Sequence, residues 1–369
     1  LINKLSGIKY YNYSNWSESY HNSKNLITPA KIQINKKKIS VQNELSKFLI
    51  HNQKIITIDT KAKIKILDLN FKTIITKKIY KREIYKNYNI DFKIITNKDK
   101  LFISDNLGNI HCLDLKTLKI LWKKNYTVPF RSNLKINNNN LFLMNSNSKI
   151  FSINTMSGDL NWSFETASKK FKDNSSYQIA ISNEKLFFTN DSGEIYCIDL
   201  KTGNILWSVV FTTDNFENKP ILLKFSPITL DQNGSLFVSS NYGKTYMIDA
   251  KSGLVKWSKP IYFTNRFALT KDYLLNTYNN RLVVLKKTNG DVVLNKAIKD
   301  SKSKKNFTFK DILIGQNSIY LFDSSGYLVS INSENFDKYY ITRPLKNFMG
   351  SLIYKKELFI WSVKTMVKF

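Results

Sequence analysis

The chain has 369 residues, 42% of them hydrophobic and 14% aromatic, so it is long and apolar enough to bury a large core. No apolar run approaches the roughly 18 residues of a membrane-spanning helix. Lys and Arg number 57 against 28 Asp and Glu, a formal net charge of +29 that raises the question of a polyanionic partner. The basic residues are scattered along the whole chain, and no helix-turn-helix, zinc-finger or RNA-binding motif accompanies them. We therefore predict no nucleic-acid partner and attribute the charge to compositional drift, with a basic face toward an anionic surface as the alternative.

The first part of the chain differs from the rest. Residues 1–29 are rich in Asn, Ser and Tyr, and predict an irregular lead-in draped over the folded body and anchored by Trp16. Residues 30–41 (AKIQINKKKISV) alternate between apolar and polar side chains, as a strand does. Residues 54–59 (KIITID) and 99–105 (DKLFISD) predict two further strands.

One phrase then recurs along the chain, and it is clearest at residues 193–207 (GEIYCIDLKTGNILW). Its first half alternates with a period of two, which indicates a strand. A tight turn follows, in which Gly203 can adopt a positive φ and Asp199 can bind turn amides. A second strand carries Trp207, whose large aromatic ring we expect to be buried.

Three more copies keep the polar anchor, the turn and the Trp, at residues 109–122, 149–162 and 244–257. Weaker copies lie at 63–76, 281–294 and 327–340, and the chain stops inside an eighth copy at 358–369. The predicted structural anchors of the repeat are Asp114, Trp122, Asn154, Trp162, Asp199, Gly203, Trp207, Asp249, Gly253 and Trp257.

A repeat of 40–50 residues holding about four short strands is typical of a propeller blade, because stacked blades bury each other's faces. Solenoid repeats are shorter and more uniform, and sandwiches do not repeat a turn with a Trp at this period. We predict an all-β chain with a lead-in at 1–29 and a single eight-bladed propeller at 30–369. The last blade lacks its outer strand, which residues 30–41 would supply to close the ring.

No constellation of residues predicts catalysis. The three histidines stand alone, and no zinc-type cluster, phosphate-binding loop or nucleophile motif occurs. Cys112 and Cys197 occupy the same place in two copies, so they are too far apart for a disulfide. We predict no catalytic, metal or cofactor-binding residue, and expect binding on the long connections at 164–178 and 209–226.

The phrase resembles the repeat of the pyrroloquinoline-quinone (PQQ)-type propellers, at residues 195–207 and 245–257 and less completely at 110–122 and 151–162. Within that group, the length and the eight copies are similar to the BamB family, lipoproteins of the β-barrel assembly machinery of Gram-negative bacteria. Residues 15–25 (NWSESYHNSKN) are similar to the lead-in of alphaproteobacterial members.

The resemblance implies a non-catalytic scaffold without a cofactor, located in the periplasm at the inner face of the outer membrane. Such a scaffold binds the POTRA domains of BamA and assists the assembly and insertion of unfolded outer-membrane proteins. The family's BamA contact would fall at Phe171 and Lys172 and at Asp214 with Glu217, although Lys172 replaces an Arg and the acid spacing differs. A lipidated Cys is also implied; it is missing from these residues, so it would lie upstream of Leu1 or be absent from this member.

Two other functions stay open. PQQ-dependent quinoprotein dehydrogenases share the fold, but they are usually longer and hold PQQ and Ca²⁺ with clustered acids. Many also have two adjacent cysteines, which Cys112 and Cys197 are not. The second alternative is another propeller that binds proteins.

Overall fold

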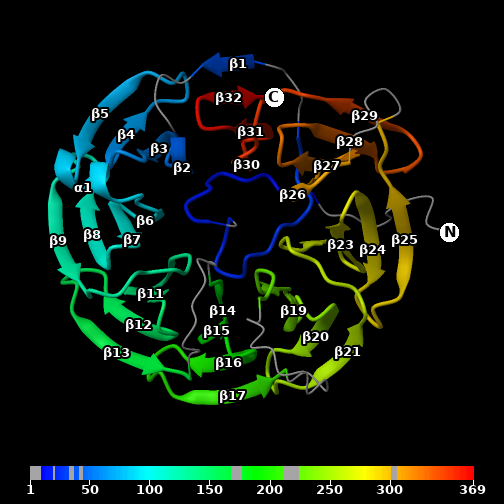
Figure 1. Cartoon of the computed structure of the whole chain (residues 1–369), viewed down its shortest axis with the longest axis horizontal. Coiled ribbons are helices and arrows are strands. Elements are labelled where there is room, and N and C mark those ends of the chain that lie inside the picture. Colours follow the sequence, from blue (N-terminus) through cyan, green and yellow to red (C-terminus); the bar gives the residue numbers. More distant parts are fainter. Residues whose placement is uncertain are drawn as a thin grey trace.

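The computed structural model describes residues 10–19, 21–32, 37–40, 45–167, 177–211, 224–300 and 306–369. These residues form eight four-stranded antiparallel sheets that stand around one axis as blades (Figure 1). The first strand of each blade lies nearest the axis and the fourth lies at the rim. The predicted eight-bladed β-propeller is confirmed.

The strands follow one another from axis to rim in blade after blade. Blade 1 holds β2 (Leu45–His51), β3 (Lys54–Asp59), β4 (Lys63–Leu67) and β5 (Thr73–Lys78). Blade 2 holds β6 (Phe92–Asn97), β7 (Lys100–Asp105), β8 (Asn109–Asp114) and β9 (Ile120–Asn125). Blade 3 holds β10 (Lys135–Asn137), β11 (Asn140–Met144), β12 (Lys149–Asn154) and β13 (Leu160–Glu165). Blade 4 holds β14 (Ile179–Ser182), β15 (Lys185–Thr189), β16 (Glu194–Asp199) and β17 (Ile205–Val210).

The second half of the ring is built in the same way. Blade 5 holds β18 (Thr229–Leu230), β19 (Ser235–Ser240), β20 (Lys244–Asp249) and β21 (Val255–Lys259). Blade 6 holds β22 (Ala268–Leu269), β23 (Tyr273–Tyr278), β24 (Arg281–Lys286) and β25 (Val292–Ala297). Blade 7 holds β26 (Phe309–Ile314), β27 (Ser318–Asp323), β28 (Leu328–Asn332) and β29 (Tyr339–Thr342). Blade 8 holds β30 (Gly350–Tyr354), β31 (Glu357–Trp361) and β32 (Thr365–Lys368), with β1 (Lys37–Ser40) as its outer strand.

The N-terminal strand β1 closes the ring. It pairs antiparallel with the last strand β32, with Lys38 opposite Val367 and Ile39 opposite Met366. Within the stretch 30–41 that was expected to supply the missing outer strand, residues 37–40 do so. With β1 as its outer strand, the eighth sheet has four strands like the other seven sheets.

Burial follows the position of a strand in its blade. β7 is buried along nearly all its length, because neighbouring blades cover both faces of its sheet. Outer strands such as β17 alternate between exposed and half-buried residues. The core therefore consists of layers between blades rather than one central mass.

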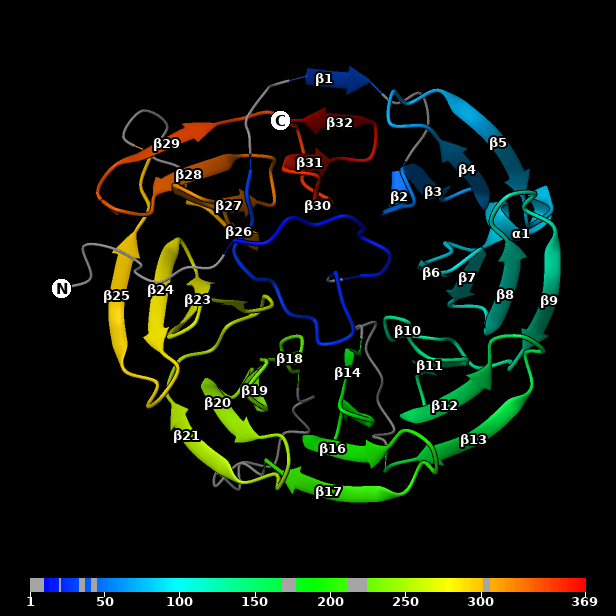
Figure 2. The same cartoon turned by 180° about the vertical axis from the view of Figure 1, so that it is seen from behind.

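Residues 10–19 and 21–32, which we call the axial segment, lie in the centre of the ring in both views (Figures 1 and 2). They were expected to drape over the propeller. Instead, the axial segment forms backbone hydrogen bonds with the first strands around the axis. A mutual pair joins Trp16 to Ile50 of blade 1, at N···O distances of 2.8 and 3.1 Å.

Further bonds reach the other blades. Backbone bonds join Thr96 to Ser17 (2.9 Å), Ile181 to Ser23 (2.7 Å), Leu230 to Lys24 (3.0 Å), Leu269 to Ile27 (3.0 Å), Ala30 to Ile314 (2.8 Å) and Lys355 to Tyr13 (2.8 Å). Blade 3 is reached through the Lys135 side chain, whose Nζ donates to the Asn22 carbonyl at 2.6 Å. The axial segment thus contacts all eight blades.

One short helix, α1 (Arg82–Asn87), connects blades 1 and 2. Within the described ranges, no helix combines the length and the apolar character needed to cross a membrane.

Candidate functional site

The polar anchor of each repeat closes the turn that follows it. In blade 4, Oδ1 of Asp199 accepts hydrogen bonds from the backbone amides of Lys201 (2.9 Å) and Thr202 (2.8 Å). These bonds hold the pKa of Asp199 below its ordinary value. Asp114, Asn154 and Asp249 accept equivalent bonds in their own turns. Each anchor is therefore engaged in its turn, and the anchors do not gather into a common site.

The recurring Trp connects each blade to the next. Nε1 of Trp162 donates to the carbonyl of Leu200 in blade 4 at 3.1 Å, and its ring covers the turn glycine Gly203. Trp207 contacts Gly253 and donates to Ala250 in the same way. Equivalent bonds run from Trp122 to Thr155 and from Trp257 to Lys287. The anchor, the glycine and the Trp therefore form a clamp between blades.

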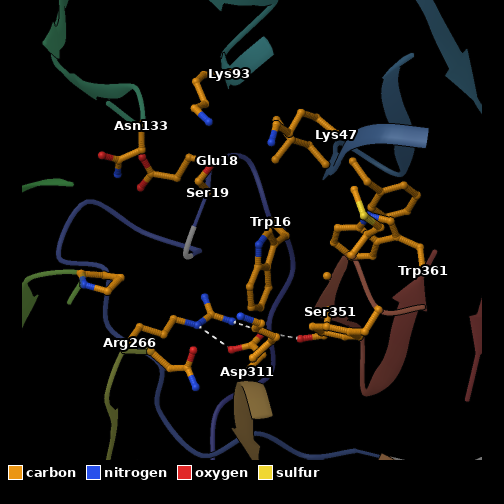
Figure 3. A pocket seen from close by; sticks show the side chains of 18 of the residues that line it. Trp16, Glu18, Ser19, Lys47, Lys93, Asn133, Arg266, Asp311, Ser351 and Trp361 are labelled. Carbon is orange, nitrogen blue, oxygen red and sulfur yellow. Dashed lines mark hydrogen bonds and ion pairs between the residues drawn. The ribbon is translucent and has the colours of Figure 1, made fainter. Parts of the chain in front are cut away.

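A cavity of about 520 Å³ lies on the axis of the ring (Figure 3). Its walls come from residues at or near the start of the first strands, such as Lys93 and Asp311, and its floor includes Trp16 and Glu18 of the axial segment. The axial segment pairs with later residues of those strands, such as Thr96 and Ile314. The cavity is therefore a funnel whose inner end is closed by the protein's own chain.

Each of the two carboxylates that line the funnel is bound by a buried cation. Asp311 accepts two hydrogen bonds from Arg266, at 3.0 and 2.9 Å, and one from the Ser351 hydroxyl at 2.6 Å. Glu18 lies 3.4 Å from Nζ of Lys135, whose side chain is fully buried. Burial raises the pKa of Glu18 and lowers that of Lys135, and their mutual attraction opposes both effects.

Other lysines and several aromatic rings line the rest of the funnel. Lys47 and Lys93 both approach the carboxylate of Asp91, at 3.5 and 2.7 Å. Phe48 and Trp361 form part of the wall, with ring centroids 5.1 Å apart. The funnel thus combines cations with an apolar surface.

The funnel was not predicted from the sequence. Asp311, Arg266, Lys135 and Glu18 lie outside the repeated phrase, and their partners are far away in the chain. One signal was present: β26 (FKDILI) places the acid Asp311 in a first strand, where a buried acid needs a partner. The residues predicted to contact a partner, Phe171, Lys172, Asp214 and Glu217, lie outside the described residues.

The described residues do not suit a quinone held with calcium. Calcium binds several oxygen ligands, commonly from more than one carboxylate. Asp311 and Glu18 are already bound to cations, and among the described residues no three His, Cys, Asp or Glu are grouped closely enough to hold a metal ion.

The comparisons with known proteins agree with this architecture. Residues 93–296, more than half of the chain, match the family model of the outer membrane protein assembly factor BamB. Among solved structures, BamB from Moraxella catarrhalis is similar, with a TM-score of 0.74 and 13% identity over 90% of this chain and 98% of that one. No curated protein matches the sequence.

Enzymes share the fold as well. A europium-containing methanol dehydrogenase has a TM-score of 0.70 and 10% identity, over 95% of this chain and 90% of that chain. The quinohemoprotein alcohol dehydrogenase from Comamonas testosteroni has a TM-score of 0.68 and 10% identity, over 97% and 81%. At such identities these similarities concern the fold alone, whereas the family model matches the sequence itself. The chain therefore belongs to the family of the outer membrane protein assembly factor BamB.

Proposed function

We propose that the protein is a non-catalytic scaffold of the β-barrel assembly machinery, which binds the POTRA domains of a BamA-like partner and assists the assembly of outer-membrane proteins. The observation that carries this proposal is the family match over residues 93–296. The scaffold would work in the periplasm at the inner face of the outer membrane, with or without a lipid anchor.

The closed funnel supports a binding role rather than a catalytic one. Glu18 and Asp311 are each bound to a cation, so neither is free to hold a metal or to act as a general base. The axial segment also fills the inner end of the ring with its own backbone.

The rim of blades 4 and 5 supports docking of another protein. β17 exposes Leu206 and Val210, the latter with 54% of its surface in water, and β21 begins with the exposed Val255. Among the outer strands, β17 and β29 carry no charged residue, whereas β5, β9, β21 and β25 each contain lysine, which protects an edge strand from pairing. An unprotected apolar edge beside the connection at 209–226 suits a surface that a partner covers.

The docking surface is testable with purified POTRA domains. The double variant Phe171→Ala with Asp214→Ala should be recovered by immobilised POTRA domains at less than a tenth of the wild-type amount. The matched control is Tyr88→Ala with Asp272→Ala, an exposed aromatic residue and an exposed acid in other parts of the ring. Equal recovery of both double variants would reject the assigned surface, and failure of the wild type to bind would reject the scaffold role.

A measurement of thermal stability tests the dehydrogenase alternative. A protein that binds PQQ with Ca²⁺ gains thermal stability when both are added, because ligands that bind only the folded state raise Tm. We expect no change in Tm. A rise of several degrees that requires both additions would support the enzyme instead.

A further inference from the structure

The charges of the funnel do not cancel. Arg266 neutralises Asp311, and Lys135 neutralises Glu18. The remaining cations of the lining are Lys47, Lys93 and Lys310, and one carboxylate outside the lining, Asp91, is shared by the first two. The funnel therefore has an excess of positive charge.

Of these three lysines, Lys47 and Lys93 are the less exposed to solvent. The Lys93 side chain is only 13% exposed, while their common partner Asp91 is 51% exposed. Burial and the charge of Lys93 lower the pKa of Lys47, which Asp91 counteracts. Figure 3 shows both lysine side chains reaching toward the same part of the cavity, on the side of Trp16 away from Arg266 and Asp311. Two ammonium groups that share one mostly solvated carboxylate can accept a second anion.

The wall beside these lysines is apolar. Trp16, Phe48 and Trp361 are all buried, and Phe348 and Met349 complete the surface at the start of blade 8. Nε1 of Trp361 is a buried donor that has no hydrogen-bond partner among the described residues. A ligand for this space needs both an anionic group and an apolar body, because an inorganic anion would leave the aromatic wall in water.

We propose that the axial funnel binds the carboxylate end of an aromatic or aliphatic chain, with the carboxylate at Lys47 and Lys93 and the apolar group against Trp16, Phe48 and Trp361. The volume of about 520 Å³ lies within the usual range of ligand pockets and accommodates a few terminal residues of a peptide. Because the axial segment closes the inner end, the funnel admits a chain end rather than a continuous chain. This inference does not depend on the proposed scaffold role.

Calorimetric titration of the full chain at low ionic strength tests the proposal. The probes are the peptide acetyl-Ala-Gly-Phe with a free carboxylate, the same peptide as its C-terminal amide, 3-phenylpropionate, and inorganic phosphate. We expect the free acid to bind at least tenfold more tightly than the amide and than phosphate. If the peptide binds more tightly than 3-phenylpropionate, the ligand is a polypeptide terminus; equal binding of the two assigns the site to small aromatic carboxylates.

Removal of the two lysine charges provides a second test of the proposal. Lys47→Met with Lys93→Met should weaken binding of the free acid at least tenfold. The matched control, Lys201→Met with Lys251→Met, removes two exposed turn lysines and should leave binding unchanged. If the double variant has a lowered Tm, the single variants Lys47→Gln and Lys93→Gln, each chosen for an unchanged Tm, give the same comparison.

Three results would overturn the proposal: equal binding of the acid and the amide, unchanged binding in the lysine variants, or no binding of any carboxylate at millimolar concentration. Binding to POTRA domains is a separate measurement, so failure of one proposal leaves the other standing.

Discussion

The indole ring of Trp162 in blade 3 lies directly on Gly203 in blade 4, so closely that a Cβ added to the glycine would come within 2.8 Å of the ring. Gly203 also has a φ of +75°, which side chains other than Gly disfavour. The glycine therefore meets two demands at once: the turn needs its conformation, and the clamp between blades needs its missing side chain.

Gly203→Ala should destabilise the protein by about 2–5 kcal/mol, because the positive φ costs about 1–2 kcal/mol and overpacking against Trp162 adds about 1–3 kcal/mol. The matched control is Gly234→Ala, whose φ is +82° but whose added Cβ would meet nothing within 4 Å. Urea unfolding measures both. Equal losses in the two variants would show that the clamp contributes nothing beyond the turn.

Trp207→Ala should lower the free energy of unfolding by about 3 kcal/mol, near the lower end for Trp truncations because the ring is only partly buried. The loss includes the hydrogen bond to Ala250 and the contact with Gly253. Its neighbour Leu206, half exposed on the same strand, should lose less than about 1 kcal/mol when changed to Ala. A loss below about 1 kcal/mol for Trp207→Ala would mean that the recurring ring does not bind the blades together.

The repeated features could be predicted because they are local. Asp199, Gly203 and Trp207 occur within nine residues, and their copies recur with the same turn and strand pattern, so one well-formed copy identifies the others. The closing strand at the N-terminus follows from the incomplete last copy. The first prediction uses information within about fifty residues of sequence, and the second uses the repeat count, which shows that the last copy lacks a strand.

The axial segment and the funnel could not be predicted in this way. Asn25 binds carbonyls 154 and 203 residues away, and Arg266 pairs with Asp311 in the next blade. These contacts occur once each, so no repetition marks them. The irregular composition of residues 1–29 indicated an absence of regular strands but not a position at the centre of the ring.

Asn25→Gly should destabilise the protein by about 2–3 kcal/mol, since the fully buried side chain donates to the carbonyls of Ile179 (3.0 Å) and Ile228 (2.9 Å). Gly tolerates the φ of +52° at this position, so the loss reports the side-chain bonds rather than backbone strain. Asn279→Gly is the control, with the same φ and an exposed side chain. Thermal unfolding of both variants measures how much the Asn25 side chain contributes to stability. A loss no larger than that of the control would show that its hydrogen bonds are not needed to hold the axial segment.

Stability should fall as the pH drops from about 6.5 to about 4. Burial, with a smaller effect of Lys123, lowers the pKa of His111 to about 4, and neither ring nitrogen has a hydrogen-bond partner among the described residues. Because its folded-state pKa lies below the unfolded value, the unfolded chain takes up a proton in this window while the folded chain does not. Acidification from pH 6.5 to pH 4 should therefore lower the free energy of unfolding by on the order of 3 kcal/mol through His111 alone.

Urea unfolding at pH 7.5 and at pH 4.5 measures this linkage, with His111→Phe as the comparison. The variant should lose less stability between the two pH values than the wild type. Some dependence should persist, because burial and the nearby charges of Arg266 and Lys135 also lower the pKa of His21 to about 4. An identical pH dependence in the wild type and the variant would contradict the prediction for His111.

The most direct test of the scaffold role is a calorimetric titration of the full chain with the POTRA domains of a BamA protein from an alphaproteobacterium. We expect saturable binding with one site per chain, unchanged by PQQ and Ca²⁺. Absence of binding at the highest attainable concentrations would contradict the scaffold role, and a Tm that rises when PQQ and Ca²⁺ are added would favour the dehydrogenase instead.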